Sequence, residues 1–213
     1  MTEVACWLPW IMYANIYSVV AGGPRERMVV SAALLIRERG AQATAISNVL
    51  KHSGAPRGSA YHYFPGGRMQ LLEEATDYAG AYIAGKISSA ESAVALLDEL
   101  IEMYRQQLIR SDYRAGCPIV AVTVEAGDPD NPERTTKVLE RAAAAFELWT
   151  DLIGRRLTAE GVDAARAEEL AMLVTASIEG AIIVARASRD VKPLDLVQRQ
   201  LRGILDAATE GKP

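Results

Sequence analysis

Apolar residues recur at helical spacing from residue 24 almost to the end of the chain. Clusters of Gly, Pro and Ser interrupt this pattern, and no segment shows the strict two-residue alternation of a half-buried strand. The pattern therefore predicts an all-α protein. Short helices come first and longer ones follow, which predicts a small N-terminal domain, residues 24–70, joined to a larger helical bundle, residues 71–213.

Three short helices are expected in the N-terminal domain. The first covers residues 24–39 and ends before a glycine, which adopts the backbone conformation that closes a helix. Thr44 is expected to cap the second helix, and the third is expected to run from Pro56, a residue that suits a first helical turn, to Tyr63. Three such helices bury little apolar surface. A fourth helix, from about residue 68 to 87, is expected to cover them and to join them to the bundle.

Five further helices are expected in the bundle. Ser88 and Glu91 have the spacing of a capping box, which places the start of a helix there. Gly161 is expected to end the longest helix. The expected elements are a helix at 88–109, a short helix after Pro118, a Gly, Asp and Pro loop at 127–132, and helices at 135–160, 163–187 and 195–209.

The last two helices carry more apolar residues than one shielded face requires. Such a surplus predicts packing against a partner helix pair. Small residues in this stripe would allow the helices to approach closely. The residues expected to meet the partner are Leu170, Leu173, Val174, Ser177, Ile178, Ala181 and Ile182.

Charge is divided unevenly along the chain. The net charge is −4, yet residues 24–70 hold seven basic and two acidic residues, a balance of +5. Residues 71–213 hold 16 basic and 24 acidic residues, a balance of −8, and Glu3 supplies the remaining negative charge. A basic domain on an acidic body is typical of a phosphate-binding module joined to a domain that does not bind nucleic acid. A solvated helix face explains the same charges, so this observation alone leaves both interpretations open.

Composition argues against several classes of protein. Half of the residues are hydrophobic, so the chain can bury a core. The two cysteines, Cys6 and Cys117, lie far apart and form neither a CxxC pair nor a cysteine-rich zinc site, which suits the reducing cytoplasm. No GxSxG, HExxH, P-loop or GxGxxG motif occurs, and two histidines leave little scope for general-base chemistry. We therefore expect no enzymatic activity, no cofactor and no metal site.

Residues 1–23 form an extension of a different character. A proline and an asparagine interrupt its apolar run, and no basic residues flank its start, so a membrane span or a signal peptide fits poorly. We expect no role at a membrane. Two interpretations stay open: an arm that packs on the body, or the product of an upstream start codon. The aromatic residues of this extension are Trp7, Trp10, Tyr13 and Tyr17.

The segment from Thr44 to Leu72 carries the motif with the clearest functional content. A Thr opens one helix, a Gly makes a turn, and basic, small and aromatic residues fill the next helix before Arg68. This pattern resembles the helix-turn-helix DNA-binding domain of the TetR family of transcriptional regulators. The longer turn at residues 65–67, with the segments GCPI at 116–119 and SIEGA at 177–181, is similar to the LmrA/YxaF-like subset. The motif is carried by Arg57-Gly58-Ser59-Ala60-Tyr61-His62-Tyr63-Phe64.

The residue types in this motif suit contacts to DNA. Arg57, Ser59 and His62 carry donors and acceptors that match base edges or phosphates in a major groove, and Gly58 lets the helix approach closely. Four further residues are expected to contact phosphates, because a helix N-terminus and a basic side chain both favour an anion. They are Thr44, Tyr61, Tyr63 and Arg68. Ala60 and Phe64 are expected in the core of the domain, and core packing is an open alternative for Tyr61 as well.

The resemblance also implies partners. It implies a cytoplasmic homodimer, built from the last two helices of each chain, that binds a palindromic double-stranded DNA operator and is released by a small lipophilic effector. Aromatic and soft apolar residues on the bundle helices are the candidates for the effector pocket, and ordinary core packing explains each of them as well. Cys117 suits a small buried hydrophobic residue better than a redox sensor. The pocket candidates are Met103, Tyr104, Leu108, Cys117, Phe146, Trp149 and Met172.

Two alternative functions stay open. One is a helical scaffold or interaction protein of the same fold that does not bind DNA, which the basic helix argues against. The other is an activator instead of a repressor.

Overall fold

The computed structural model describes residues 22–125 and 132–210, and within these ranges it contains nine helices and no strand. The predicted all-α class is therefore confirmed. The expected aromatic extension lies outside the described residues up to residue 21, and so does the expected loop at 127–132 up to residue 131.

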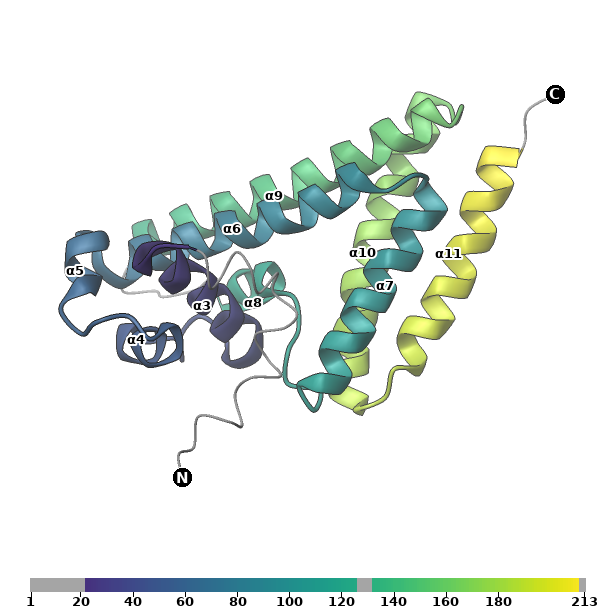
Figure 1. The fold of residues 1–213 in the computed structure, drawn as a ribbon. Coiled ribbons are helices and arrows are strands. Elements are labelled where there is room, and N and C mark those ends of the chain that lie inside the picture. Colours follow the sequence, from purple (N-terminus) through teal and green to yellow (C-terminus); the bar gives the residue numbers. More distant parts are fainter. Residues whose placement is uncertain (1–21, 126–131, 211–213) are drawn as a thin grey trace.

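The N-terminal helices gather at one end of the molecule, where α6 leads from them into the bundle (Figure 1). Their core is built from Met28 of α3, Val49 of α4 and Phe64 at the end of α5, all of which are buried. Helix α6 covers this core with Leu71 and Leu72. The bounds are α3 (Pro24–Arg39), α4 (Ile46–Ser53), α5 (Ser59–Tyr63) and α6 (Gly67–Ser89).

Two predicted helix starts in this domain are wrong. Ala45 occupies the N-cap position of α4, and the buried hydroxyl of Thr44 instead donates to the carbonyl oxygen of Gly40 at 2.7 Å. Helix α5 begins at Ser59 and not at Pro56, because the chain first makes a turn in which the backbone N–H of Ser59 donates to the Pro56 carbonyl at 3.0 Å. Both errors come from short-range hydrogen bonds that compete with capping.

Five helices form the bundle, and one predicted cap is wrong there. Helix α6 runs through Ser88 to Ser89, so the next helix is capped by Ser92, whose hydroxyl oxygen accepts from the N–H of Ala95 at 3.0 Å. Asp163 caps α10 in the same way, accepting from the N–H of Ala165 at 3.0 Å. The bounds are α7 (Ala93–Arg110), α8 (Pro118–Glu125), α9 (Pro132–Ala159), α10 (Ala164–Ser188) and α11 (Lys192–Glu210).

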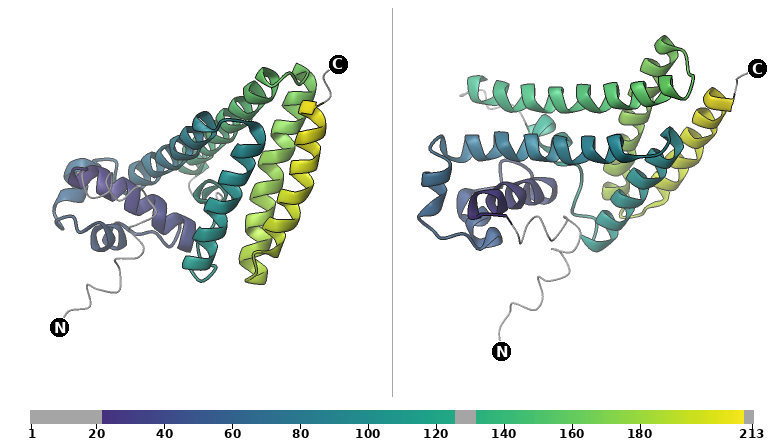
Figure 2. Two further views of the ribbon diagram at one scale, coloured as in Figure 1. Left: turned by 45° about the vertical axis from the view of Figure 1, so that its right-hand side comes forward. Right: turned by 45° about the horizontal axis from the view of Figure 1, so that its top comes forward.

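The long helices α6 and α9 lie side by side and connect the two ends of the molecule (Figure 2). They approach closely at Gly80, where an added Cβ would lie 2.9 Å from the Cβ of Ala145. The indole N–H of Trp149 on α9 donates to the carbonyl oxygen of Gly80 at 2.9 Å. This pair of helices therefore forms a tightly packed rod between the N-terminal domain and the rest of the bundle.

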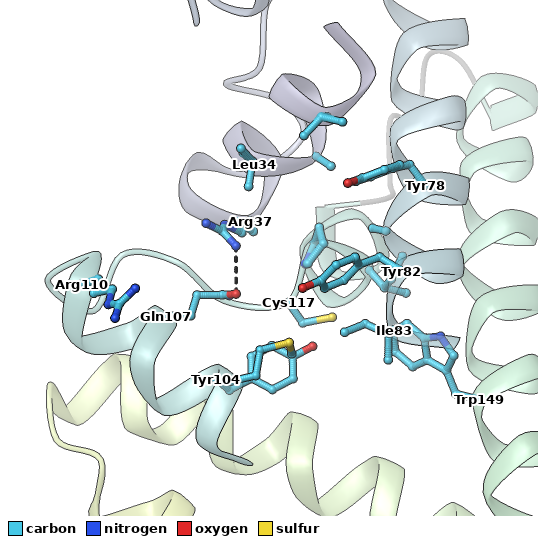
Figure 3. Close-up of a pocket in the computed structure, with 16 residues that line it drawn as sticks. Leu34, Arg37, Tyr78, Tyr82, Ile83, Tyr104, Gln107, Arg110, Cys117 and Trp149 are labelled. Atoms are coloured by element: carbon cyan, nitrogen blue, oxygen red, sulfur yellow. Dashed lines mark hydrogen bonds between the residues drawn. The ribbon is translucent and has the colours of Figure 1, made fainter. Parts of the chain in front are cut away.

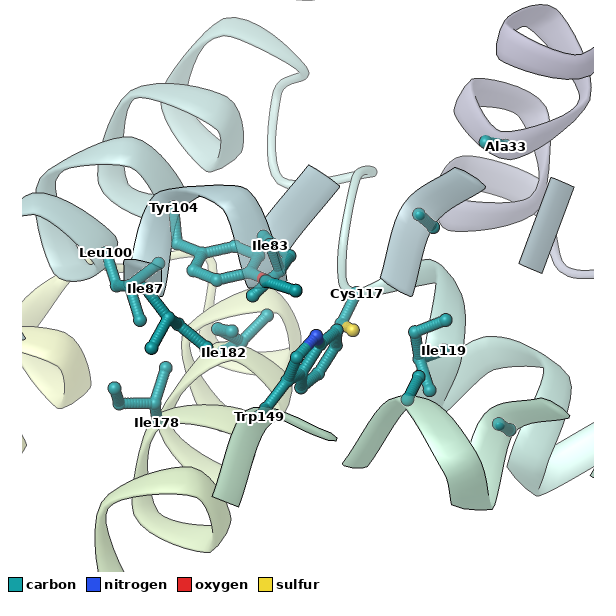
Figure 4. Packing of buried hydrophobic residues seen from close by; sticks show 14 of the residues in the cluster. Ala33, Ile83, Ile87, Leu100, Tyr104, Cys117, Ile119, Trp149, Ile178 and Ile182 are labelled. Carbon is teal, nitrogen blue, oxygen red and sulfur yellow. The ribbon is translucent and has the colours of Figure 1, made fainter. Parts of the chain in front are cut away.

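The apolar stripe predicted on α10 mostly faces the interior of its own chain. Ile178 and Ile182 point into the core beside Ile87, Leu100 and Tyr104 (Figure 4). Leu173 is exposed, and Ser177 is partly exposed. The predicted stripe is thus corrected, because α10 carries apolar residues on two faces and helical spacing alone does not say which face lies inside. The buried members of the stripe are Leu170, Val174, Ile178, Ala181 and Ile182.

The other face of α10 is exposed and apolar. It carries Met172, Leu173, Ile183 and Val184, and Leu196 extends it onto α11. Among the described helices, α10 is also the one whose length and composition would allow it to cross a membrane. The central helix of a helical bundle has the same properties, so this observation alone is weak evidence for a span.

The contact at Gly80 predicts a difference between two glycines of the same helix. Gly80→Ala places a methyl group against Ala145, whereas Gly85→Ala meets nothing within 4 Å. We expect Gly85→Ala to raise the free energy of unfolding by up to about 1 kcal/mol through helix propensity. We expect Gly80→Ala to be less stable than Gly85→Ala by about 1–3 kcal/mol through overpacking. Urea unfolding followed by circular dichroism measures both, and equal stability of the two variants would contradict this packing.

Candidate nucleic-acid interface and adjoining pocket

Helix α5 presents its polar residues to the outside. Buried Ala60 and Phe64 anchor the helix on the core, as predicted for these two residues. Arg57, Tyr61 and His62 are exposed, and the side chain of Tyr61 is 70% exposed. The alternative in which Tyr61 is a packing residue is therefore contradicted, and its exposed ring is available to a partner.

Two predicted DNA-contacting residues of α5 are partly buried and hold the helix in place. The hydroxyl of Ser59 donates to the carbonyl oxygen of Pro56 at 2.6 Å. The ring of Tyr63 packs against the domain core and meets the edge of His62, with the ring centroids 5.2 Å apart. These contacts fix the exposed side chains on a short helix that has few hydrogen bonds of its own.

Gly58 lies at the start of α5 in a conformation that any residue adopts, with φ −79°. An added Cβ would meet nothing within 4 Å. Neither the backbone nor the packing of the chain requires a glycine here. A residue without a side chain at this exposed point leaves room for a partner to approach the backbone.

Arg68 and Thr44 are used inside the domain. The guanidinium of Arg68 donates to the backbone carbonyls of Thr44, at 3.0 Å, and of Ala41. With the buried Thr44 hydroxyl bonded to Gly40, both side chains organise the turn between α3 and α4. The phosphate contacts predicted for them are corrected accordingly, because their polar groups already have partners in the turn.

The positive charge of the N-terminal domain is also partly used inside the molecule. Arg25 pairs with Glu74 at 2.7 Å, and Arg27 donates to the carbonyl oxygen of Gly22 at 2.9 Å. The guanidinium of Arg37 points away from α4 and α5 into the body. The balance of +5 in the sequence therefore overstates the charge available to a nucleic acid. The basic residues that lie exposed are Arg39, Lys51 and Arg57, together with Arg25.

A pocket of about 500 Å³ lies between the N-terminal domain and the bundle. Helices α3, α6, α7 and α9 and the start of α8 supply its walls (Figure 3). Tyr82 of α6 points toward Tyr104 of α7, Tyr78 of α6 points toward α3, and Trp149 of α9 closes one side. Aromatic walls with a few polar groups are typical of small-molecule sites.

Four of the seven pocket candidates line this space, and three do not. Met103, Tyr104, Cys117 and Trp149 line it. Phe146 packs behind, edge-on to Trp149 with the centroids 5.3 Å apart, and Leu108 is fully buried in the core. Met172 is 59% exposed on the outer face of α10. The three corrections share a cause, because residue type identifies apolar side chains but not the direction in which they point.

The polar half of the pocket was not predicted from the sequence. Arg37 and Gln107 line it, and so do Tyr78 and Tyr82. A signal was present for the arginine, because Arg37 shares one helical face with Val30 and Ala33, which are buried. A basic residue on the inner face of an amphipathic helix indicates a buried polar site, and counting it toward a DNA-binding surface concealed this.

Arg37 is mostly buried, and its guanidinium is only partly hydrogen-bonded. One terminal N–H donates to Oε1 of Gln107 at 2.9 Å, whereas Nε has no partner. Burial lowers the pKa of Arg37, and the neighbouring Glu38 carboxylate offsets part of that effect. Because a guanidinium has a very high intrinsic pKa, it stays charged in the folded protein.

Three hydrogen bonds tie the end of α3 to the bundle, and we call them the α3 joint. The first is the bond from Arg37 to Gln107. In the second, the backbone N–H of Gly116 donates to the Arg37 carbonyl at 2.8 Å. In the third, Arg186 of α10 donates to the Glu38 carbonyl at 3.1 Å. The pocket, the helix-turn-helix and α10 therefore meet at one place.

Helix α8 makes a second link between the pocket and the N-terminal domain. Its first residues, Pro118 and Ile119, line the pocket. At its other end the carboxylate of Glu125 accepts from the backbone N–H of Gln42 at 2.8 Å, in the turn between α3 and α4. A displacement of α8 by a pocket ligand would thus reach the same turn that Arg68 organises.

A buried acidic group lies behind the pocket. Burial raises the pKa of Glu179 on α10 to about 7, and its carboxyl interacts with the Cys117 thiol. Burial also raises the pKa of Cys117 well above its ordinary value, so the thiol stays protonated. The described residues include no group of three or more His, Cys, Asp or Glu side chains that could hold a metal ion.

The chain is similar to known regulators over most of its length. Residues 29–75 match the family described as bacterial regulatory proteins, tetR family, and residues 93–200 match the LmrA/YxaF-like transcriptional regulator C-terminal domain.

An uncharacterised HTH-type transcriptional regulator of Mycobacterium tuberculosis is 65% identical over 183 residues, which cover 86% of this chain and 94% of the relative. The HTH-type transcriptional regulator LmrA of Bacillus subtilis is 29% identical over 81% of this chain and 92% of its own. A crystal structure of a TetR regulator from Chloroflexus aurantiacus superposes with a TM-score of 0.65 at 26% identity, covering 84% of this chain and 92% of that chain.

Glu179 predicts a pH dependence of stability. Its pKa in the folded protein, about 7, lies above the ordinary value of 4.5, so the fold favours the protonated carboxyl. The stabilisation of the folded state by the protonated Glu179 carboxyl is fully present below pH 4.5 and is lost as the pH rises through 7. Relative to Glu179→Gln, the free energy of unfolding of the wild type is expected to fall by about 3 kcal/mol between pH 4.5 and 8. Urea unfolding at several pH values measures it, with Glu168→Gln on the exposed face of α10 as control, and a constant difference between wild type and Glu179→Gln contradicts the burial of an acid.

Proposed function

Since the chain belongs to the TetR family of transcriptional regulators, we propose that it is a repressor that binds a palindromic operator as a homodimer and is released by a small lipophilic effector. The observation that carries the proposal is that one helix, α3, contributes both to the core beneath the exposed α5 and to the wall of an aromatic pocket. A regulator of this kind needs both sites on one rigid element.

The DNA contacts are proposed on the exposed side of α5. Arg57 and His62 supply donors for base edges, and Tyr61 supplies an exposed hydroxyl for a phosphate. Lys51 at the end of α4 adds positive charge beside them. A helix of five residues reads few base pairs, so specificity requires a second copy held at a fixed distance.

The homodimer is proposed on the outer face of α10 and α11. Exposed apolar residues cover this face, and Gly180 and Gly203 have nothing within 4 Å of an added Cβ. Glycines on the outside of a helix let a partner helix come close. Two helices from each chain would then form a four-helix bundle, and the exposed residues proposed for it are Leu173, Ile183, Val184 and Leu196.

Release of the operator follows from differential binding. An effector lowers operator affinity only if it binds more tightly to an arrangement in which the two α5 helices are wrongly spaced. Because α3 and α8 each touch both the pocket and the α3–α4 turn, a ligand that moves either of them changes the position of α4 and α5. A coupling of about 1–3 kcal/mol would weaken operator binding roughly 5- to 150-fold.

The first test is operator binding. DNA fragments bound by the purified protein are selected from genomic DNA, and affinity for the recovered site is measured by mobility shift with excess nonspecific competitor. Arg57→Ala is expected to weaken specific binding by about 10-fold or more, since a bidentate contact to a base is worth about 1–3 kcal/mol.

The matched control is Lys86→Ala, which removes an exposed cation from the part of α6 that lies in the bundle. It is expected to bind the operator like the wild type. A protein that selects no specific DNA would favour the scaffold alternative, and equal losses in both variants would assign the effect to general charge. Reporter expression from the selected site distinguishes a repressor from an activator.

The second test is dimerisation. Ile183→Glu places a charge in the centre of the proposed interface, where its desolvation is unfavourable. We expect sedimentation to report the monomer mass of 23.0 kDa for this variant and twice that for the wild type. Leu148→Glu, at an exposed apolar position of α9, is the control and is expected to remain dimeric. A dimeric Ile183→Glu protein would place the interface elsewhere.

A further inference from the structure

The pocket is lined by Arg37, an arginine that forms no salt bridge. Among the described residues no carboxylate lies within ion-pair distance of its guanidinium, the neighbouring Glu38 carboxylate acts on it only at longer range, and its Nε is unpartnered. None of the 16 residues that line the pocket is Asp or Glu. The polar end of the pocket is therefore cationic.

A buried guanidinium of this kind favours an anion. The side chain of Gln107 accepts its hydrogen bond, and a neutral amide offsets less of the desolvation of a charge than a carboxylate does. The planar guanidinium presents a fork of N–H groups that matches the two oxygens of a carboxylate or the oxygens of a sulfonate. A ligand anion would give the unpartnered Nε the hydrogen bond that the protein does not supply.

The rest of the pocket has the opposite character. Tyr78, Tyr82 and Trp149 provide flat aromatic surface, and Ile83 and Ile119 provide aliphatic surface (Figure 3). Arg37 and Gln107 lie together at the boundary between α3 and α7, so the guanidinium and the amide are at one end of the pocket, while the walls carry aromatic rings with single hydroxyls. A ligand that fits both parts has an apolar body and one charged head.

We propose that the effector is an amphipathic organic anion, with an aromatic or aliphatic body and a single carboxylate or sulfonate head that binds Arg37. The proposal rests on the effector-responsive function proposed above and specifies the chemical class of the effector. The body lies between the tyrosines and Trp149, and the head displaces the Gln107 side chain from the guanidinium.

The same contact explains how the ligand would be sensed. Displacing Gln107 breaks one of the three hydrogen bonds of the α3 joint and leaves α3 attached to the bundle by backbone contacts of Arg37 and Glu38. The arrangement in which Gln107 is bonded to Arg37 is then the one that binds the operator. The arrangement in which the anion is bound to Arg37 is the one that releases the operator. The charged head acts on α3 directly, without a relay through the dimer interface.

The test uses two fluorescent probes with the same aromatic body. One is 8-anilinonaphthalene-1-sulfonate, an anion, and the other is N-phenyl-1-naphthylamine, which lacks the sulfonate. Each is titrated into the full-length protein without DNA. We expect the anion to bind with one site per chain and more tightly than the neutral probe.

Three variants locate the charge preference. Arg37→Met keeps the length of the side chain and is expected to weaken anion binding about 10- to 100-fold, the range for a hydrogen bond to a charged group, while neutral-probe binding stays the same or strengthens. Arg37→Lys keeps the charge and is expected to retain most of the anion preference. Arg39→Met, which removes an exposed charge from the same helix turn, is expected to behave like the wild type.

Circular dichroism and neutral-probe binding establish that each variant is folded with its pocket intact. The proposal is overturned if folded Arg37→Met and Arg37→Lys both bind the anion as the wild type does. It is also overturned if Arg39→Met loses as much affinity for the anion as Arg37→Met does. These titrations contain no DNA, so they separate the two conclusions. Anion binding that depends on Arg37, in a protein that binds no specific operator, would support the proposed ligand site and contradict the proposed repressor function. Specific operator binding, in a protein whose anion binding does not depend on Arg37, would support the repressor function and contradict the proposed ligand site.

Discussion

The attachment of α3 to the bundle is the constraint on which the rest of the structure depends. Helix α3 supplies the core beneath α4 and α5, and its last turn is bonded to α7, to Gly116 and to α10. The N-terminal domain is too small to bury a large core by itself, so its orientation is set by what α3 and α6 contact in the body. A change at this attachment therefore alters the position of the exposed helix α5.

Buried polar groups are concentrated around this attachment. Arg37 lacks one hydrogen bond, and Glu179 is an acid whose pKa burial raises to about 7. Such groups cost stability unless they are satisfied. Natural proteins retain them at sites where a ligand or a switch uses them, and here both lie against the pocket that separates the DNA-binding domain from the proposed dimer face.

Local patterns predicted the helices well because a helix is built from local hydrogen bonds. Helix α3 has the predicted bounds, and Ala60 and Phe64 are buried as expected while Arg57 and His62 are exposed. The exact helix starts failed where local hydrogen bonds competed with capping. The remaining predictions failed where a partner came from far along the chain. Arg68 donates hydrogen bonds to carbonyls more than 20 residues away, and Arg37 is bonded to Gln107. Which of the two apolar faces of α10 is buried depends on the helices that pack against it. No periodicity in one helix contains that information.

If the α3 joint holds the operator-binding arrangement that we propose, weakening the joint must weaken operator binding, and Gln107→Ala weakens it. This variant removes the side-chain bond to Arg37, and with it the bond that Gln107 donates to the Gly116 carbonyl beside the joint, and it substitutes no residue of α4, α5 or the proposed dimer face. Fluorescence anisotropy with a labelled operator, in the absence of any effector, is predicted to show a loss of affinity of about 5-fold or more, the lower end of common allosteric coupling. An unchanged affinity in a folded, dimeric Gln107→Ala protein would contradict the account.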